Sequence, residues 1–272
     1  MIVISVVIYK HTLNNLLATF NSIIEIKTPK KVMIIDNSKE NELSKEIISF
    51  GFEYIHNPAN PGFGAAHNIA IKKSIEMKAK YHLVLNPDVF FDSIILNNAL
   101  EYLELNPDVG LLMPKVLFPN GNVQYLPKLL PSPFHLFIRK IPLTSYLFKN
   151  TMNNYEYRFL KEELPVKVPI VSGCFSLFRV DVLEKIGGYD ERFFMYFEDF
   201  DISRRAYKIA KNIYLPNIHI YHEYGRGANK SFRLLKIFIR SAIKYFNKWG
   251  WLCDADRIKI NIEALQNAKR LK

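Results

Sequence analysis

The hydrophobic residues in the first hundred positions recur with two different periods. Short, mainly β-branched and apolar runs predict strands buried on both faces, at residues 2–8, 32–36, 53–55 and 81–85. Between them, apolar residues three and four positions apart predict helices at residues 12–26, 40–49, 63–78 and 93–105. Such alternation is typical of βαβ units. We therefore expect an α/β fold with a mostly parallel central sheet and helices on both faces.

The pattern changes after residue 110. Short β-like pieces at 109–117 and 122–126 precede residues 127–167, which are rich in proline, aromatic residues and lysine. This segment is too hydrophobic for a solvated linker, so we interpret it as an insertion or lid. The remaining predicted elements are strands at 168–178, 213–215 and 218–222, helices at 180–186 and 199–211, and a long helix from about residue 230.

The composition narrows the classes of function. With 49% hydrophobic and 23% charged residues among 272, the chain is neither disordered nor of low complexity. Its two cysteines exclude a disulfide framework and a cysteine zinc site. The apolar run at residues 1–9 is too short for a membrane span and lacks signal-peptide features, so we expect a cytoplasmic protein. The net charge of +11 indicates an anionic partner: nucleic acid, an acidic membrane surface or a phosphorylated small molecule.

Polar residues stand where predicted strands end, and ligands of open α/β sheets bind outside the carboxyl ends of the strands. Asp36 ends the second predicted strand, and Asn86-Pro87-Asp88 follows the fourth. The carboxylate of Asp88 can hold a divalent cation that in turn holds phosphate oxygens. Asn-Pro-Asp is also ordinary turn chemistry, so this motif alone leaves both interpretations open.

Two further motifs are weak when taken singly. The loop at residues 60–68 contains Gly62 and opens a helix, which suits close approach of an anion, but ordinary helix-entry turns look the same. His222 ends a strand shortly before Arg226, which lies between two glycines. This arrangement fits a metal ligand followed by a diphosphate-binding arginine, or a partly buried histidine with satisfied hydrogen bonds.

Residues 187–201 place acidic residues within an otherwise aromatic run. Glu198, Asp199 and Asp201 fall at the start of a predicted helix, where the helix dipole alone favours acidic residues. Aromatic surroundings also raise the proton affinity of a carboxylate, which suits a general base. The segment is therefore the most informative stretch for catalysis.

Together these motifs resemble the family-two inverting nucleotide-sugar glycosyltransferases of GT-A fold, and they are most similar to the bacterial rhamnosyltransferase-like branch. The resemblance rests on residues 34–38, 60–68, 85–88, 172–174 and 188–201, and it extends from residue 1 to about 225. It implies a Rossmann-like GT-A catalytic domain at residues 1–229, followed by a C-terminal helical segment at 230–272. Within the domain it implies a nucleotide-binding half (1–110) and an acceptor-binding half (111–229).

The resemblance also implies roles for individual residues. Asp199 would be the catalytic base, with Glu198 as its rival. Asp88 and His222 would bind Mg²⁺ or Mn²⁺, although Asn86 replaces the first acid of the family's metal motif. The donor would be bound by strand-end and loop residues, with Asp36 on the base: Asp36, Asn37, Asn60, Gly62, Asn68, Asp88 and Arg226.

These roles imply an inverting transfer of a sugar from a nucleotide-diphosphate donor, dTDP-rhamnose or a UDP-sugar. The acceptor would be a hydroxyl of a bacterial cell-surface glycan or lipid-linked precursor. A nucleic-acid-binding protein fits less well, because no recognisable module for that partner is present. A nucleotidyltransferase is expected to have a basic, glycine-rich loop after the first strand, and residues 9–12 do not form such a loop. Because Asn86 replaces the first acid of the metal motif, the alternative function is that of a non-catalytic, membrane-associated protein that binds nucleotide sugars or acts as a scaffold.

Residues 230–252 carry six basic residues and no acidic one. The basic residues lie three or four positions apart and share one helical face, with aromatic and aliphatic residues on another. Such a helix suits an anionic membrane surface, and equally suits an ordinary surface helix whose apolar face packs on the domain. The first interpretation predicts peripheral attachment to the inner face of the plasma membrane.

Overall fold

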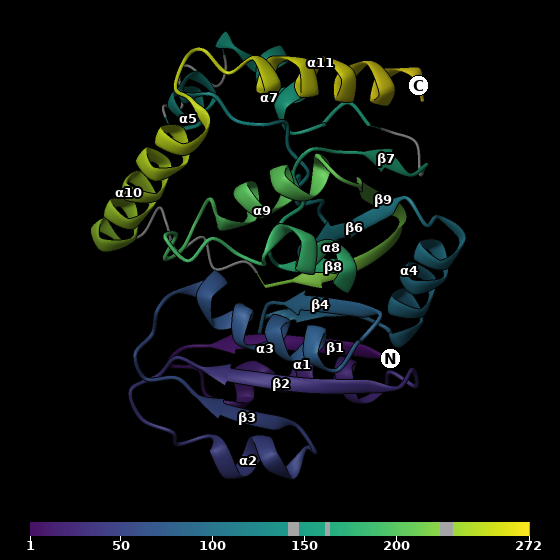
Figure 1. Cartoon of the computed structure of the whole chain (residues 1–272), viewed down its shortest axis with the longest axis vertical. Helices are drawn as coiled ribbons and strands as arrows, with labels where there is room; N and C mark the ends of the chain where they lie inside the picture. Colours follow the sequence, from purple (N-terminus) through teal and green to yellow (C-terminus); the bar gives the residue numbers. More distant parts are fainter. Residues whose placement is uncertain (141–146, 161–163, 224–230, 272) are drawn as a thin grey trace.

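The computed structural model contains a nine-stranded sheet with helices around it (Figure 1) and describes residues 1–140, 147–160, 164–223 and 231–271. The strand order is β3-β2-β1-β4-β8-β6-β9-β5, and β7 pairs with β9. The first part of the chain forms β1 (Ile2–Ile8), α1 (Leu13–Ile24), β2 (Lys30–Asp36), α2 (Ser44–Ser49), β3 (Glu53–His56), α3 (Phe63–Glu76), β4 (Tyr81–Leu85), β5 (Val89–Phe90) and α4 (Ser93–Leu105). The second part forms β6 (Val109–Leu117), α5 (Pro133–Lys140), α7 (Lys149–Tyr155), β7 (Val166–Lys167), β8 (Phe175–Arg179), α8 (Val180–Ile186), α9 (Glu198–Tyr207), β9 (Lys211–His222), α10 (Phe232–Trp249) and α11 (Ala255–Arg270).

Strand direction confirms the expected mostly parallel sheet. β1 lies parallel to β2 and β4, β2 lies parallel to β3, and β6 lies parallel to β9. β8 runs antiparallel to both β4 and β6. The register pairs Ile8 with Asp36, and Asp36 with His56, so the carboxyl ends of three strands meet at one edge. A ligand is expected at that edge.

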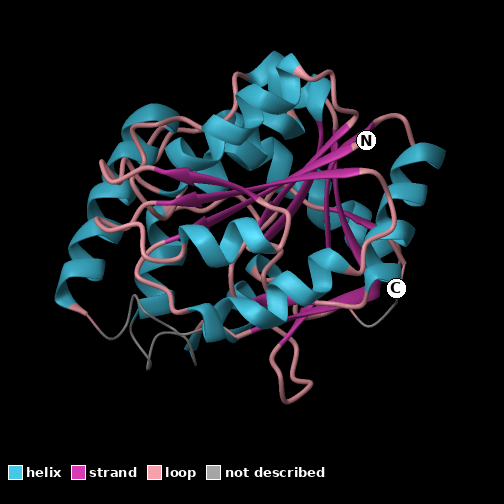
Figure 2. Cartoon of the chain, turned by 90° about the horizontal axis from the view of Figure 1, so that it is seen from below, coloured by secondary structure: helices cyan, strands magenta, loops and turns pink. Residues whose placement is uncertain are grey.

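Helices cover both faces of the sheet (Figure 2). Successive residues of a strand point to opposite faces, so the apolar side chains of a strand can pack against helices on both sides. Ile4 of β1 belongs to the large core cluster that contains Phe20 of α1. Its neighbour Val3 belongs instead to a second cluster, with Ala66 and Ala70 of α3. The nearly continuous apolar sequence of β1 therefore serves two cores.

The predicted insertion at residues 127–167 packs into the main core. The backbone N–H of Leu129 donates to the carbonyl of Tyr155 at 3.0 Å, and both side chains are buried. The strand expected at 122–126 is wrong: within these described residues, Val123 makes only an isolated β-bridge. After the preceding turn, only Val123 is bridged to Leu117, and a single pair is too short to form a strand.

The two strands predicted at 213–215 and 218–222 form one strand, β9. Its pairing with β6 is irregular between Pro114 and Lys115. Pro216 of β9 has no N–H to donate to this part of the ladder, so the pairing is interrupted there and then resumes.

The single long C-terminal helix expected from the sequence is two helices, α10 and α11. The chain turns at Gly250, whose φ of 101° favours glycine. Asp254 then caps α11 by accepting a hydrogen bond from the backbone N–H of Arg257. None of the described helices has the length and apolar content that crossing a membrane requires.

Candidate active site

Asp36 and Asn37 are held rigidly at the carboxyl edge of the sheet. The buried carboxylate of Asp36 accepts one hydrogen bond from the N–H of Ser38 at 2.8 Å and another from the hydroxyl of Tyr54 at 2.9 Å. Asn57 donates to the side-chain oxygen of Asn37 at 2.7 Å. These contacts fix Asp36 and Asn37, which are both predicted to bind the donor, at the carboxyl edge of the sheet.

Asp88 and His222 come together at the same edge. Val89 pairs with His222 in the β5–β9 ladder, and the carbonyl of Asp88 accepts from the N–H of Glu223 at 2.9 Å. This pairing places Nε2 of His222 3.2 Å from Oδ1 of Asp88. The two predicted metal ligands are therefore neighbours.

Gln124 sets the orientation of the His222 ring. Its side-chain amide donates to the carbonyl of His222 at 2.8 Å, so its oxygen is the atom that faces Nδ1 of the ring at 3.1 Å. Nδ1 therefore donates to Gln124, which leaves Nε2 as the ring nitrogen that faces Asp88. A histidine whose other nitrogen is fixed in this way is the usual arrangement of a metal ligand.

The two side chains fit a divalent cation. Oδ1 of Asp88 is buried and has no hydrogen-bond donor among the residues that the structure describes. A lone pair from Nε2 and a carboxylate oxygen facing each other suit a bound cation between them. The described residues contain no group of three or more histidine, cysteine or acidic side chains around a common point, so Asp88 and His222 would hold the ion together with oxygens of the donor.

His11 is a residue of this edge that the sequence reasoning missed. It lies in the loop after β1, where its Nδ1 accepts from the N–H of Tyr9 at 3.1 Å. Burial lowers the pKa of His11, and the charges of Asp88 and Asp36 act in the opposite direction. His11 therefore lies within electrostatic reach of both Asp88 and Asp36. Its place in the loop after the first strand was the available signal in the sequence.

Asp88 and Asp199 approach the same wall of the site, which is formed by Gly173 and Cys174. The carbonyl of Cys174 accepts from the N–H of Asn86 at 2.9 Å, next to Asp88. On the other side, a Cβ placed on Gly173 would lie 3.6 Å from Cβ of Asp199. Burial, together with the charges of both Asp88 and Asp199, raises the pKa of the Cys174 thiol to about 12. One short segment thus contacts both the loop that carries Asp88 and the side chain of Asp199.

Glu198 and Asp199 begin α9 but have different environments. Burial, followed by the charge of Asp199, raises the pKa of Glu198 well above its ordinary value. Burial also raises the pKa of Asp199 to about 6, while the charge of Lys128 and N–H donors of Gly173 and Phe200 oppose the rise. Of the two acids, Glu198 therefore holds its proton more strongly, and Asp199 ionises more readily.

Gly62 has a direct structural reason to be glycine. With φ of 115°, its Cβ position would lie 2.3 Å from the carbonyl oxygen of Phe194. The adjacent Phe63 N–H donates to that same carbonyl at 2.8 Å. The loop of Asn60 and Gly62 therefore touches the acidic-aromatic segment, and its predicted contact with the donor stays a prediction.

Asn68 also holds this segment. Its side-chain amide donates to the carbonyl of Tyr189 at 2.9 Å, and its oxygen accepts from the N–H of Tyr189 at 2.8 Å. A second donation reaches Glu191 at 3.0 Å. Its predicted part in the nucleotide pocket stays a prediction, as does that of Arg226, which lies outside the described residues.

Asp201 has a structural function that separates it from the other acids of α9. Its carboxylate binds Arg205 at 2.8 Å, Lys248 at 2.6 Å and the indole N–H of Trp249 at 2.8 Å. Because Lys248 and Trp249 belong to α10, Asp201 anchors that helix to α9. This leaves Glu198 and Asp199 as the acids available to the site.

The amino-acid sequence places the chain among known proteins. Residues 3–187 match the sequence model described as Glycosyl transferase family 2. The chain belongs to this family. It is accordingly a glycosyltransferase, as expected from its motifs.

Several named relatives transfer rhamnose. The N-acetylglucosaminyl-diphospho-decaprenol L-rhamnosyltransferase of Mycobacterium tuberculosis is 25% identical over 220 residues, which are 74% of this chain and 69% of the relative. Rhamnosyltransferase WbbL of Escherichia coli is 26% identical over 227 residues, or 79% of this chain and 81% of the relative.

Solved structures with similar backbones confirm the GT-A fold. GalNAc-T7 with UDP, GalNAc and Mn²⁺ superposes with a TM-score of 0.64 at 17% identity, covering 89% of this chain and 47% of that one. The mannosyltransferase PcManGT from Pyrobaculum calidifontis, in complex with GDP-Man and Mn²⁺, gives a TM-score of 0.61 at 15% identity, covering 99% of this chain and 73% of that one. The family-2 chain thus spans less than half of the first of these two structures.

Proposed function

We propose that this glycosyltransferase transfers a sugar, with inversion, from a nucleotide-diphosphate donor to a hydroxyl of a lipid-linked glycan precursor. The observation that carries the proposal is that the segment Gly173–Cys174 contacts both the backbone just before Asp88 and the side chain of Asp199, while His222 faces Asp88. The rhamnosyltransferase relatives favour dTDP-rhamnose as the donor, with UDP-sugars as the next candidates. The name of the mycobacterial relative, which includes a diphospho-decaprenol, favours a lipid-linked acceptor.

Asp199 is the base in this proposal because burial raises its pKa less than that of Glu198, so Asp199 is the member of the pair that ionises more readily. It takes the proton of the acceptor hydroxyl while the oxygen of that hydroxyl bonds to the anomeric carbon. The bond from that carbon to the donor phosphate breaks, and the nucleoside diphosphate leaves with the electron pair. Attack opposite the leaving group inverts the anomeric centre.

On the donor side, Asp36 and Asn37 are fixed for contact with the nucleoside, and Asp88 and His222 face the diphosphate. A divalent cation at Asp88 and His222 would supply positive charge against the diphosphate as it leaves. Gln124 keeps Nε2 of His222 directed at that position. These residues therefore bind and orient the donor, while the base acts from the other side of Gly173.

A panel of nucleotide sugars tests this function. UDP-, dTDP- and GDP-sugars are added with and without Mn²⁺, and the unfolding temperature is measured. We expect saturable, Mn²⁺-dependent stabilisation by one nucleotide class, followed by transfer to a synthetic lipid diphosphate with inversion seen by NMR. Stabilisation without transfer to any acceptor would favour the non-catalytic alternative, and no stabilisation by any nucleotide would contradict the proposal.

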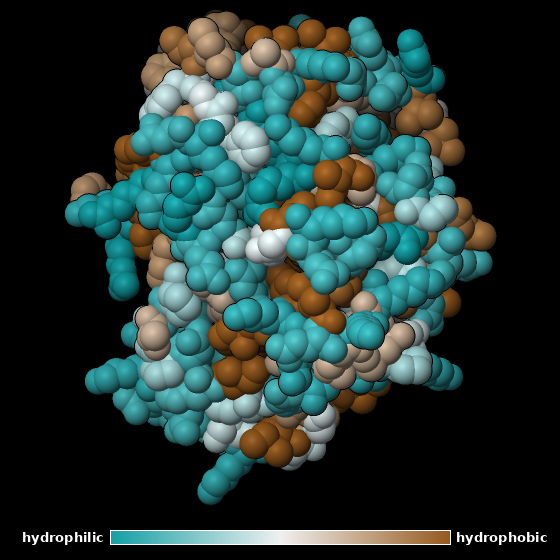
Figure 3. Space-filling view, viewed as in Figure 1, coloured by the Kyte–Doolittle hydropathy of each residue, from teal (hydrophilic) through white to brown (hydrophobic). Residues whose placement is uncertain are grey.

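We propose further that α10 rests on an anionic membrane, which fits a lipid-linked acceptor. One side of α10 packs Phe238 and Phe246 against the aromatic cluster of Phe193 and Phe197. A different side remains open to solvent, and apolar surface interrupts the polar surface along the edge of the molecule where α10 lies (Figure 3). The helix thus has one packed side, as the packing interpretation of its sequence predicts, and one open side, which the membrane proposal uses.

The open side of α10 combines apolar and basic residues. Phe232 is 83% exposed and Ile239 is 48% exposed, and they line one shallow groove with Leu235, Lys236 and Arg240. Two of the six basic residues point elsewhere, because Lys244 donates to a carbonyl of the 187–201 segment and Lys248 binds acidic residues there and on α9. The exposed pattern suits insertion of apolar side chains between anionic headgroups.

A further inference from the structure

Two aromatic residues directly before the Glu198–Asp199 pair have a strained backbone. Tyr196 has a φ of 68° and Phe197 has a φ of 67°, so both lie in the left-handed region. Residues with a Cβ rarely adopt this region, and two bulky ones in succession do so only where the surrounding structure holds them. Backbone strain of this kind is concentrated at functional sites. The contacts that hold the pair are therefore informative about the site.

The left-handed pair determines where α9 begins. Phe197 directly precedes the helix, and its carbonyl already accepts from the N–H of Asp201 at 2.9 Å. A helix more often begins after an extended residue with a capping side chain, such as serine or aspartate. Here the left-handed conformation leads the chain straight into the helix, so Glu198 and Asp199 are its first two residues. The position of Asp199 thus depends on the turn formed by residues 195–197.

Ser241 of α10 holds the peptide unit that enters this turn. The residue is 3% exposed, and its hydroxyl donates to the carbonyl of Met195 at 2.8 Å. Because a peptide unit is rigid, the direction of this carbonyl and the φ of Tyr196 change together when the unit rotates between fixed neighbours. A return of Tyr196 to negative φ by this rotation would therefore turn the carbonyl away from Ser241 and break the hydrogen bond.

Aromatic side chains of α10 hold the second left-handed residue. The side chain of Phe197 is 2% exposed. Its ring centroid lies 5.2 Å from that of Phe238 and 5.4 Å from that of Tyr245, and both partners belong to α10. Burial of an aromatic ring in such a cluster is favourable and offsets part of the cost of the left-handed backbone.

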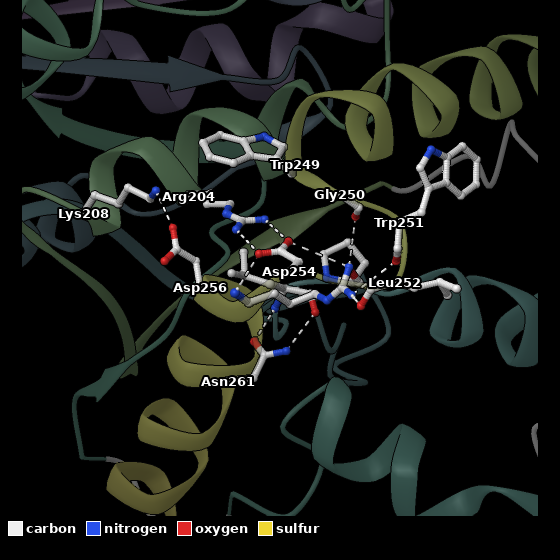
Figure 4. Close-up of polar contacts among 12 residues, drawn as sticks. Arg204, Lys208, Trp249, Gly250, Trp251, Leu252, Asp254, Asp256 and Asn261 are labelled. Carbon is white, nitrogen blue, oxygen red and sulfur yellow. Dashed lines mark hydrogen bonds and ion pairs between the residues drawn. The ribbon is translucent and has the colours of Figure 1, made fainter.

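The other end of α10 is fixed to α9 itself. Figure 4 shows Trp249 beside Arg204 of α9, whose Cζ lies over the indole ring, 4.2 Å from its centroid. Arg204 also binds Asp254, directly before α11, through two contacts of 2.7 Å. Through Ser241 and Trp249, α10 therefore contacts the chain both before and after Asp199.

We propose that Ser241 is a positioning residue for the transfer reaction: by holding the Met195 carbonyl, it keeps the turn formed and Asp199 in place to receive the proton of the acceptor. The inference rests on the proposed role of Asp199 as the base. Catalytic groups must be held closely by neighbouring hydrogen bonds and packing, because small displacements lower the rate strongly. From the other side, the N–H of Phe63 already holds the carbonyl of Phe194 at 2.8 Å. Loss of the Ser241 hydroxyl should therefore release the turn and leave the Gly62 loop in place.

The kinetics of Ser241→Ala test this role. We expect turnover at saturating substrates to fall about tenfold, because the Met195 carbonyl loses its donor and the turn relaxes in most molecules. Isothermal titration with Mn²⁺ should show unchanged donor affinity, since the proposed donor-binding residues lie on other segments. Ser74→Ala is the matched control, because Ser74 is another buried helical serine, and its hydroxyl donates to the carbonyl of Ala70 at 2.9 Å. The control should lower stability without lowering turnover.

Two substitutions of Tyr196 separate the strain from the loss of a side chain. Tyr196→Gly removes the cost of a positive φ, whereas Tyr196→Ala removes the same ring and keeps a Cβ. Combined with Ser241→Ala, the glycine should restore most of the turnover and the alanine should not. Equal turnover in the two double variants would overturn the inference. If Ser241→Ala does not fold, Ser241→Cys, whose thiol is a weaker donor, should lower turnover in the same direction.

Combination with Asp199→Asn separates this inference from the proposed function. Because Ser241 acts through the base, Ser241→Ala should cause no further loss of turnover once Asp199→Asn has removed the base. A further loss of the same size, or unchanged turnover in Ser241→Ala alone, would overturn the role of Ser241 and leave the proposed function standing. If Asp199→Asn alone leaves transfer intact, the proposed base itself is wrong.

Discussion

The Nε2 atom of His222 lies 3.2 Å from Oδ1 of Asp88, although one residue ends β9 and the other follows β4. The pair forms because β5, only two residues long, joins the end of β9 directly after Asp88. Gln124 holds Nδ1 of the ring, so Nε2 is the nitrogen that faces the carboxylate. This arrangement is suited to sharing a cation.

Loss of either side chain of this pair should weaken metal-dependent donor binding. We expect Asp88→Ala and His222→Ala to lower the Mn²⁺-dependent affinity for the nucleotide sugar strongly, because each removes a proposed ligand. Gln124→Leu should cost about tenfold, since it removes the group that orients the ligand. Isothermal titration of donor with and without Mn²⁺ measures these effects. His219→Ala is the control, as this exposed histidine lies on the same strand; equal losses in all variants would contradict the site.

Amide substitutions should separate the two neighbouring acids of α9. Asp199→Asn is expected to lower turnover about 100-fold or more, because the amide cannot accept the proton. Glu198→Gln should have a far smaller effect, since burial and the charge of Asp199 raise the pKa of Glu198, which therefore ionises less readily than Asp199. Steady-state kinetics at saturating donor, with donor affinity measured separately, tests the pair. The opposite ranking would transfer the base role to Glu198.

The buried ion pair between Arg204 and Asp254 should be important for stability. Asp254→Asn leaves the Arg204 guanidinium, which is 1% exposed, without its charged partner. Breaking one side of such a pair costs about 3–5 kcal/mol of unfolding free energy. Chemical denaturation measures the loss. Asp256→Asn removes an exposed ion pair with Lys208 nearby and should change stability little, so equal effects would refute the assignment.

Vesicle binding tests the open side of α10. Replacing Phe232 and Ile239 by serine removes two exposed apolar side chains without touching the packed side. Each lost insertion is worth about 1.5–3 kcal/mol, so binding to phosphatidylglycerol vesicles should weaken at least tenfold in sedimentation. The matched control replaces Ile258 and Ile262 of α11, which are also exposed. Unchanged binding of the α10 variant would exclude this surface.

Periodic patterns in the first 105 residues were sufficient for the alternation of the main strands and helices there and for the mostly parallel sheet. Burial on both faces forces β1 to be apolar throughout, and helical spacing marks α1 and α3, so these local signals survive in any correct fold. The predicted element boundaries were wrong where contacts with neighbouring segments determine the structure. Pro216 does not divide β9, because β6 supports both parts, and the helix expected after residue 230 is interrupted at Gly250.

Strand-end positions were also sufficient to name Asp88 and His222 as candidates, and the acidic residues within an aromatic run at a helix start named Glu198 and Asp199. The sequence could not distinguish Glu198 from Asp199, since the two differ by one position and only their burial and neighbours shift their proton affinities apart. It gave no sign of Lys128 or Gln124, because ordinary polar residues in loops carry no periodic signal, and only its position after a strand marked His11. Their proximity to the acids arises when distant segments pack, and electrostatic effects depend on distance and burial in three dimensions.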